Sequence, residues 1–276
     1  MSSIISSQEL PKPGRKFFAC FPAAKQLPCW IYRPKEVKRS DQVIVAIHGI
    51  SRNSEQQVRA YRKLADEHGL WLIAPEFSHS AFPNYQRLVG NSKDARADLS
   101  LNRLLLAFRQ VLGISQLSIH LCGYSGGAQF AHRYALLYPH FISSLTLVSA
   151  GWYSLINPNL PYPIGLKNWP TWLGSPRTKD FLSLPTLVLV GNQDTSRDKS
   201  LRQNPLLDKE QGVNRLERAQ RWVKTTNQAK QALGLSQEIK LNLLDQQQHD
   251  FLKNTKQSDM LDQISTFWHQ TKGNNQ

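Results

Sequence analysis

The hydrophobic residues of this chain gather in short apolar runs, which are separated by longer segments of mixed polarity. Apolar runs of this length are typical of strands that are buried on both faces of a parallel sheet. They occupy residues 42–47, 70–74, 117–122, 144–148, 186–191 and 238–244. Two further runs, residues 17–21 and 29–33, predict an antiparallel hairpin at the start of the sheet.

Between these runs the apolar side chains recur with the period of a helix. The clearest segment is residues 98–112, where Leu101, Leu104 and Phe108 lie on one stripe and Gly113 follows as a stop. Other helices are expected at residues 61–68, 126–138, 213–233 and around 260–268. Strands alternating with helices predict one α/β domain over residues 17–276, with a mostly parallel central sheet covered by helices on both faces.

Two stretches depart from this alternation. Residues 1–16 are polar and contain Pro and Gly, which predicts a flexible N-terminal arm. Residues 151–184 scatter aromatic side chains among prolines without a regular period. Because irregular segments of this length are usually functional, we expect a cap-like or lid-like insertion after the 144–148 strand.

The centre of the chain carries a Gly-x-Ser-x-Gly motif at residues 123–127, between an apolar run and a helical segment. This order is that of a nucleophile elbow, in which a sharp turn lifts the hydroxyl of Ser125 clear of the sheet. Side chains at Gly123 and Gly127 would collide where the helix crosses its strand. The turn also puts the N–H of Gly126 at a helix N-terminus, where negative charge is favoured.

Two further polar groups follow later strands at the same expected edge of the sheet. Asp194 follows the 186–191 strand, and His249 follows the 238–244 strand. A serine hydroxyl becomes a nucleophile when an imidazole takes its proton, and a buried carboxylate holds that imidazole in the required tautomer. We therefore predict a triad of Ser125, His249 and Asp194. Asp198 lies four residues further on and is the alternative acid.

The other histidines fit the role of base less well than His249. They lie in or beside predicted helices, within a strand, before the serine, or in the 48–51 loop: His68, His132, His140, His269, His120, His79 and His48. We expect His48 to shape its loop by hydrogen bonding.

The tetrahedral intermediate of acyl transfer needs two converging hydrogen-bond donors. We predict the N–H of Gly126 and the N–H of Ile50, which follows the 42–47 strand. The candidate walls of a substrate pocket are Tyr124, Trp152, Tyr153 and Trp169.

These motifs together resemble the α/β-hydrolase-fold serine hydrolases, in the branch of esterases and polyhydroxyalkanoate depolymerases. The resemblance rests on residues 48–53, 74–77, 123–127, 191–194 and 211–215, and it extends from about residue 17 to the end of the chain. It departs from the family pattern at Gln246, Gln247 and Gln248, where members often carry a glycine shortly before the histidine. Secreted depolymerases also carry signal sequences and disulfides, and neither is evident here, which argues against an extracellular polymer substrate.

Charge and cysteine content narrow the remaining possibilities. The formal net charge is +14, from 34 Lys and Arg against 20 Asp and Glu. Without an accompanying recognition motif, we interpret this as a solvated basic surface and not as a nucleic-acid site, although an anionic substrate remains compatible. Three cysteines do not make a disulfide framework. With no transmembrane run and no evident signal sequence, a cytoplasmic location is expected.

The leading hypothesis is hydrolysis of a small-molecule carboxylic ester through an acyl-enzyme on Ser125. A thioesterase or amidase with the same triad is the first alternative, since one triad serves all three acyl transfers. A non-catalytic binding protein of the same fold is the second. The histidine spacing predicts no metal, and the glycine pattern predicts no nucleotide cofactor. The oligomeric state stays open.

Overall fold

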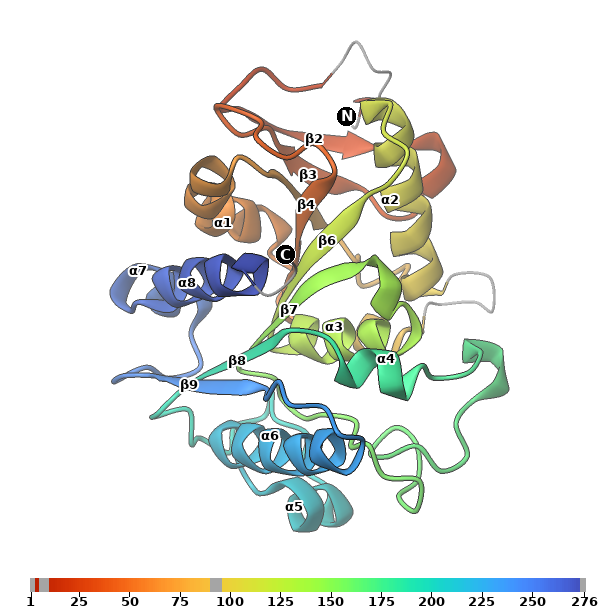
Figure 1. The fold of residues 1–276 in the computed structure, drawn as a ribbon, viewed down its shortest axis with the longest axis vertical. Helices are drawn as coiled ribbons and strands as arrows, with labels where there is room; N and C mark the ends of the chain where they lie inside the picture. Colours follow the sequence, from red (N-terminus) through yellow and green to blue (C-terminus); the bar gives the residue numbers. More distant parts are fainter. Residues whose placement is uncertain (1–2, 5–9, 90–95, 274–276) are drawn as a thin grey trace.

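A computed structural model describes residues 3–4, 10–89 and 96–273 of the chain (Figure 1). Over these residues the strands form one sheet in the order β1-β2-β3-β5-β4-β6-β7-β8-β9. The strands are β1 (Ser3–Ile4), β2 (Lys16–Cys20), β3 (Cys29–Tyr32), β4 (Gln42–Ile47), β5 (Trp71–Pro75), β6 (Ser118–Tyr124), β7 (Ile142–Val148), β8 (Thr186–Gly191) and β9 (Lys240–Leu244).

The sheet is parallel from β5 to β9 and antiparallel around β3. Each pair of neighbours from β5 through β4, β6, β7 and β8 to β9 is parallel, whereas β3 runs antiparallel to both β2 and β5. The mostly parallel sheet and the hairpin predicted from the apolar runs are therefore confirmed, and the strand ends differ from the prediction by no more than two residues.

The central strand β4 shows why its sequence is apolar at nearly every position. Val43, Val45 and Ile47 pack into one core, while Ile44 and Ala46 pack into the core on the other face of the sheet. Successive side chains of a strand point to opposite faces, so a strand covered twice needs apolar residues at both.

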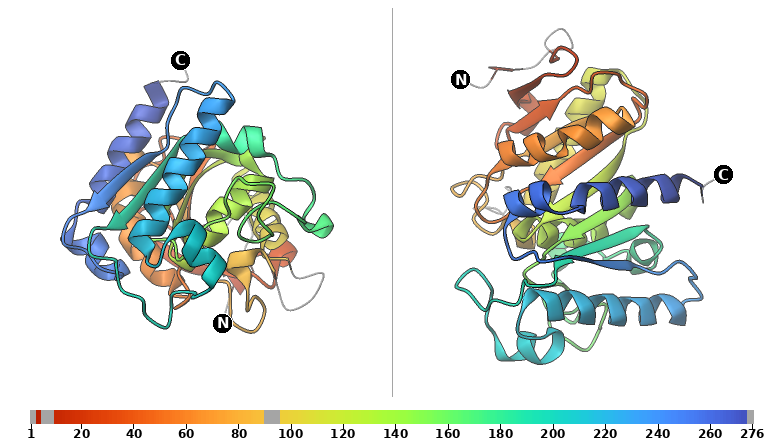
Figure 2. Two further views of the ribbon diagram at one scale, coloured as in Figure 1. Left: turned by 90° about the horizontal axis from the view of Figure 1, so that it is seen from below. Right: turned by 90° about the vertical axis from the view of Figure 1, so that its left-hand side faces the viewer.

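Helices cover both faces of the sheet (Figures 1 and 2). They are α1 (Ser54–His68), α2 (Ala97–Leu112), α3 (Gly126–Leu137), α4 (Thr178–Leu182), α5 (Pro205–Gln211), α6 (Arg215–Ala232), α7 (Phe251–Gln257) and α8 (Met260–Gly273). Buried residues of α1, α7 and α8 join one core, and those of α2, α3 and α6 join the other. Among the described residues, no helix has both the length and the apolar character needed to cross a bilayer.

Outside the irregular stretch of residues 151–184, three helices depart from the pattern-based prediction. Helix α1 begins at Ser54, about two turns before the predicted start, because its first half is mostly polar and carries little apolar period. Helices α5 and α7 are seven residues long and were not predicted. Their signals are local. Asn204 accepts from the N–H of Leu207 ahead of α5, and Asp250 accepts from the N–H of Lys253 in α7, as N-cap residues do.

The two irregular stretches contain some regular structure. Within residues 151–184 lie a 3-10 turn at Thr171–Leu173 and helix α4. Backbone hydrogen bonds also close a turn, such as that from the N–H of Leu155 to the carbonyl of Ile164. Ser3–Ile4 pairs with β2, whereas residues 1–2 and 5–9 lie outside the described residues. The cap and the flexible arm both stay predictions.

At the carboxyl edge of the sheet, the loops after β8 and β9 pack directly against each other. A Cβ added to Gly191 would lie 2.1 Å from the carbonyl oxygen of Gln247, so only glycine allows this approach. The N–H of Gln193 donates to that same oxygen at 3.0 Å, and the N–H of Asn192 donates to the carbonyl of Leu244 at 3.0 Å. The two loops are therefore held as one unit.

This contact predicts an unequal cost for two glycine substitutions. Gly191→Ala should lower the free energy of unfolding by more than about 2 kcal/mol, because the new methyl group meets backbone. Gly113→Ala is the matched control, since its Cβ would meet no atom within 4 Å although its φ is +67°. It should cost only about 1–2 kcal/mol. Urea unfolding measures both, and equal costs would contradict the described packing of the two loops.

Candidate active site

Ser125 occupies the turn between β6 and α3 with a backbone that is unusual for a serine. Its φ and ψ are 53° and −112°. Backbone strain of this kind costs on the order of 1–3 kcal/mol and persists only where the surroundings impose it. The surroundings here are tight, because a Cβ at Gly123 would lie 2.3 Å from the carbonyl oxygen of Gly127. A Cβ at Gly127 would lie 2.2 Å from that of Ile47. The turn has the sterics expected of a nucleophile elbow.

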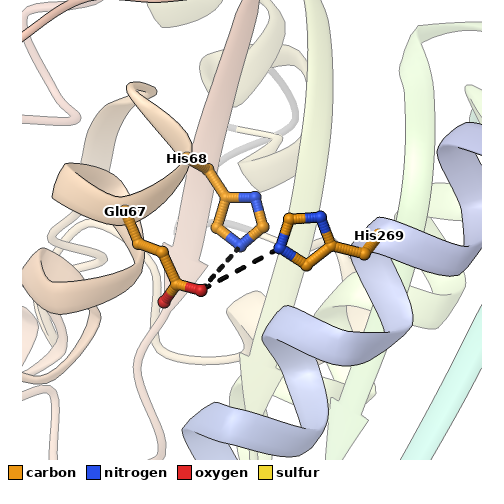
Figure 3. A group of neighbouring side chains, drawn as sticks. All are labelled: Glu67, His68 and His269. Atoms are coloured by element: carbon orange, nitrogen blue, oxygen red, sulfur yellow. Dashed lines mark ion pairs between the residues drawn. The ribbon is translucent and has the colours of Figure 1, made fainter.

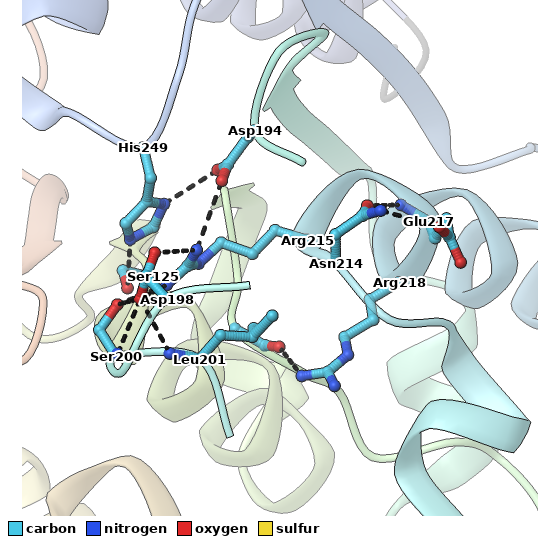
Figure 4. Close-up of polar contacts among 11 residues, drawn as sticks. Ser125, Asp194, Asp198, Ser200, Leu201, Asn214, Arg215, Glu217, Arg218 and His249 are labelled. Carbon is cyan, nitrogen blue, oxygen red and sulfur yellow. Dashed lines mark hydrogen bonds and ion pairs between the residues drawn. The ribbon is translucent and has the colours of Figure 1, made fainter. Parts of the chain in front are cut away.

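The side chains of Ser125, His249 and Asp194 form one hydrogen-bonded chain (Figure 4). His249 Nε2 lies 3.0 Å from Ser125 Oγ, and His249 Nδ1 lies 2.9 Å from Asp194 Oδ2. A carboxylate can only accept, so Nδ1 carries the proton and Nε2 presents its lone pair to the hydroxyl. Asp194 is 1% exposed. Of the two aspartates that the sequence left open, Asp194 is thus the one bonded to the imidazole.

Tyr124 supports the imidazole from one side. Its ring stacks on that of His249 with centroids 5.2 Å apart and an interplanar angle of 20°. It also contacts Phe251, the first residue of α7. Tyr124 was expected as a pocket wall, and the structure puts it against the histidine.

Arg215, the first residue of α6, connects the two aspartates. Its Nη1 lies 3.5 Å from Asp194 Oδ1 and 3.1 Å from Asp198 Oδ2, and its Nη2 donates to Ser200 Oγ at 2.6 Å. The guanidinium is 1% exposed. Burial alone would raise the pKa of Asp198, but hydrogen bonds from Arg215 and Ser200 outweigh it and hold that pKa well below the ordinary carboxyl range. Asp198 therefore stays ionised and shares the charge of Arg215.

Sequence reasoning did not assign a role to Arg215, because a basic residue on a predicted helix usually faces solvent. The one signal was its place in residues 211–215, the segment noted in the family resemblance. The neighbouring residues Gln211 and Arg218 are buried too. Gln211 bonds both backbone groups of Tyr153, and Arg218 donates to the carbonyl of Gly151 at 2.7 Å. This part of the chain ties the loop after β7 to α5 and α6.

The two predicted oxyanion donors are neighbours beside the serine. A Cβ built on Gly126 would lie 3.4 Å from the nitrogen of Ile50 and 2.8 Å from its Cγ2. The Ile50 loop is held by His48, whose Nε2 accepts from the N–H of Phe77 at 3.0 Å. Tyr85 donates its hydroxyl to the carbonyl of His48 at 2.7 Å. Burial lowers the pKa of His48 to about 4, so the ring is neutral at pH 7 and accepts this bond.

Arg52 fixes the opposite side of this loop and was not expected from the sequence. Its Nη1 donates to the carbonyls of Phe77, Ser78 and Phe82. Its own φ is 59°. The guanidinium thereby joins the loop after β4 to the segment after β5.

Each of the other candidate pocket residues has contacts of its own. Trp152 is buried with the guanidinium of Arg133 over its ring at 4.1 Å. Tyr153 is fully buried and stacks on Trp222 at 4.6 Å. Trp169 is half-buried, and its Nε1 donates to the carbonyl of Gly174 at 2.7 Å. Their role as substrate contacts stays a prediction.

A surface hollow of about 630 Å³ lies elsewhere, along β9 and α8, between residues such as Leu241 and Phe267. Ser125, Asp194 and His249 are not among its lining residues.

Comparison with known proteins agrees with the fold. Residues 42–255 match the family model described as alpha/beta hydrolase fold. The solved structures that resemble the chain include poly(aspartic acid) hydrolase-1 from Sphingomonas sp. KT-1, with a TM-score of 0.76 and 25% identity over 93% of this chain and 98% of that one. A poly(3-hydroxybutyrate) depolymerase from Bordetella parapertussis gives a TM-score of 0.75 and 24% identity over 95% of this chain and 92% of that one.

More distant structures share the fold at lower similarity. An S-formylglutathione hydrolase from Agrobacterium tumefaciens gives a TM-score of 0.56 and 16% identity over 91% of this chain and 93% of that one. No curated protein matches the chain in sequence. The matched range includes Ser125, Asp194 and His249, and also the N–H groups of Ile50 and Gly126. The protein therefore belongs to the alpha/beta hydrolase fold family, as its motifs predicted, and is a hydrolase of that family.

Proposed function

We propose that the protein is a serine hydrolase that cleaves carboxylic esters through an acyl-enzyme on Ser125. The observation that carries this proposal is the continuous hydrogen-bonded chain from Asp194 through His249 to Ser125, at 2.9 and 3.0 Å. Each group in it has the chemistry that acyl transfer requires of its position: an acceptor-only carboxylate, an imidazole of defined tautomer and a hydroxyl on a strained turn.

In the proposed acylation, His249 Nε2 takes the proton of Ser125 Oγ while Oγ attacks the ester carbonyl. The carbonyl oxygen becomes an oxyanion, which the N–H groups of Gly126 and Ile50 stabilise. One such donor contributes on the order of 3 kcal/mol in comparable sites. The imidazolium then gives its proton to the leaving alcohol, and the C–O bond breaks. A water molecule repeats the sequence on the acyl-enzyme and releases the acid.

Arg215 would act on this reaction through Asp194. It contacts Oδ1, the oxygen that does not face the imidazole, and so leaves Oδ2 for His249. A carboxylate held from both sides keeps its orientation while the imidazolium forms and disappears. We therefore regard Arg215 as a positioning residue and Asp198 as the second carboxylate that balances its charge.

A second candidate within the same chemistry is hydrolysis of an amide in an anionic substrate. The chain is 25% identical to a protein named as a hydrolase of poly(aspartic acid), a polymer that is linked by amides and rich in carboxylates. The net charge of +14 would attract such a substrate over a distance of about 8–10 Å at moderate salt. We favour the ester because its leaving group departs more readily than that of an amide.

Covalent labelling tests the nucleophile. A fluorophosphonate probe should label the wild-type protein and should not label Ser125→Ala, because the probe reacts with a serine that an adjacent base has activated. Ser80→Ala is the control, since Ser80 is an exposed serine of a nearby loop. Labelling that survives in a folded Ser125→Ala protein would rule out this serine, and failure to label folded wild type would favour the non-catalytic binding protein.

Two amide substitutions distinguish the acids. Asp194→Asn should lower kcat by roughly 10⁴-fold, because the amide no longer enforces the required tautomer of His249. Asp198→Asn should lower kcat by less than about tenfold, because Asp198 contacts Arg215 and not the imidazole. Steady-state kinetics on a chromogenic ester measure both. The acid assignment is wrong if the two effects are reversed.

A matched substrate panel identifies the bond that is cleaved. With one acyl group presented as an ester, a thioester and an anilide, we expect kcat/KM to be highest for the ester. Chains of increasing length then define the acyl site. Poly(aspartic acid) belongs in the panel, and cleavage of this polymer without any esterase activity would replace the ester proposal by the amide one. For an anionic substrate kcat/KM should also fall as salt screens the attraction.

A further inference from the structure

A second group of reactive side chains lies where the end of α1 meets α8, apart from the proposed active site (Figure 3). Glu67 and His68 are the last two residues of α1, and His269 belongs to α8. Their ligand-type atoms all lie within 4.8 Å of one another. Glu67 Oε1 is 4.0 Å from His68 Nε2 and 3.9 Å from His269 Nε2.

We propose that these three side chains bind a Zn²⁺ ion. The ligands are His68 Nε2, His269 Nε2 and a carboxylate oxygen of Glu67, and a water molecule completes the coordination. Two imidazoles and a carboxylate are a donor set that zinc accepts, whereas Mg²⁺ and Ca²⁺ prefer sets made only of oxygen. This site was not predicted from the sequence, because residues 67–68 and 269 are far apart along the chain.

Zinc binding requires the site to close, by up to about 1.5 Å between the two imidazole nitrogens, since the three ligand atoms lie within 4.8 Å of one another. Ligand atoms of a tetrahedral zinc, each about 2.0–2.1 Å from the metal, lie about 3.3 Å from one another. The two gaps to Glu67 must therefore close by roughly 0.6 Å from their present 3.9 and 4.0 Å. The side chain of His68 is 1% exposed and fixed, while those of Glu67 and His269 are 42% and 62% exposed. The two more exposed side chains have room to move toward the buried one.

Ser265 of α8 orients two of the ligands. Its Oγ donates to Glu67 Oε1 at 2.7 Å and lies 2.8 Å from His68 Nε2. Because the hydroxyl proton goes to the carboxylate, Nε2–H donates to Ser265 in the metal-free protein. When zinc binds, this proton moves to Nδ1 and the freed lone pair of Nε2 takes the metal, so the imidazole stays neutral. The bond from Ser265 to Glu67 remains and holds the carboxylate, as outer-sphere partners do in zinc sites.

The surrounding charges leave Glu67 to attract the ion. Lys63 and Asp262, one to two turns away on the same two helices, pair with each other at 3.1 Å. Lys38 donates to the backbone carbonyl of Glu67 at 3.3 Å, and its positive charge disfavours a metal ion nearby. The C-terminal end of α1, where the helix dipole is negative, favours the metal ion. A bound ion would fasten α8 to α1.

Zinc titration of wild type, two ligand variants and two control variants tests the proposal. Isothermal titration calorimetry on wild type should give one site, and His269→Ala and Glu67→Gln should each weaken binding at least tenfold. Both substituted side chains are partly exposed, so the fold should tolerate the changes. His140→Ala is the matched control, because it removes an exposed histidine that lies elsewhere. His249→Ala should also keep the wild-type affinity, because His249 is not one of the proposed ligands.

Thermal unfolding supplies a second readout. At a free Zn²⁺ concentration one hundred times Kd, the Tm of wild type should rise by about 5 °C, and the chelator EDTA should reverse the rise. Mg²⁺ should give no such rise, and neither should Zn²⁺ with His269→Ala. The proposal is overturned if wild type binds no zinc, or if His269→Ala and Glu67→Gln bind it as tightly as wild type does.

Discussion

The close approach of α3 to the carboxyl end of β4 is the constraint on which the site depends. Gly127 lies so near the carbonyl oxygens of Ile47 and His48 that a single methyl group would not fit between them. This contact fixes where α3 begins, and therefore where the turn at Ser125 must bend. It also fixes the exit of β4, from which the chain continues into Ile50. The position of the nucleophile and that of the second N–H donor thus follow from one backbone contact.

Electrostatics supply the second constraint, on the far side of the imidazole. Taking a carboxylate out of water is costly unless hydrogen bonds and an opposite charge replace the lost hydration. Asp194 has both, because His249 and Arg215 occupy its two oxygens. Arg215 would in turn be an expensive buried cation without Asp198 and Ser200. The buried charges of Asp194 and Arg215 therefore compensate each other, and the more exposed Asp198 and Ser200 complete the hydrogen bonding of the guanidinium.

The apolar pattern was sufficient to predict the strands from β2 to β9, although not β1, and spacing was sufficient to predict which side chains meet at the edge of the sheet. Strand β4 could be placed to the residue, because both of its faces are buried and each position reports that burial. Ser125, Asp194 and His249 could be predicted to meet because parallel strands present their following loops at one edge. Their catalytic roles remain the proposal made above.

What the sequence did not reveal depends on contacts between distant segments. Helix α7 is too short for a periodic signal and depends on the capping side chain of Asp250. Arg215 looks like an ordinary surface residue of a helix until the loop that carries Asp198 is folded against it. His68 and His269 become neighbours only when α8 packs on α1. Each of these features depends on two segments lying close together in space, which a local sequence pattern does not predict.

The joined loops after β8 and β9 have a consequence for how this scaffold can diversify. Asp194 and His249 lie on loops that form one unit, because Gly191 packs directly against Gln247. Insertions between Leu244 and His249 would therefore shift the base and the acid out of register with the serine. The chain from residue 155 to 184 carries no member of this block. We therefore expect changes at exposed positions of that stretch to leave the reacting groups aligned.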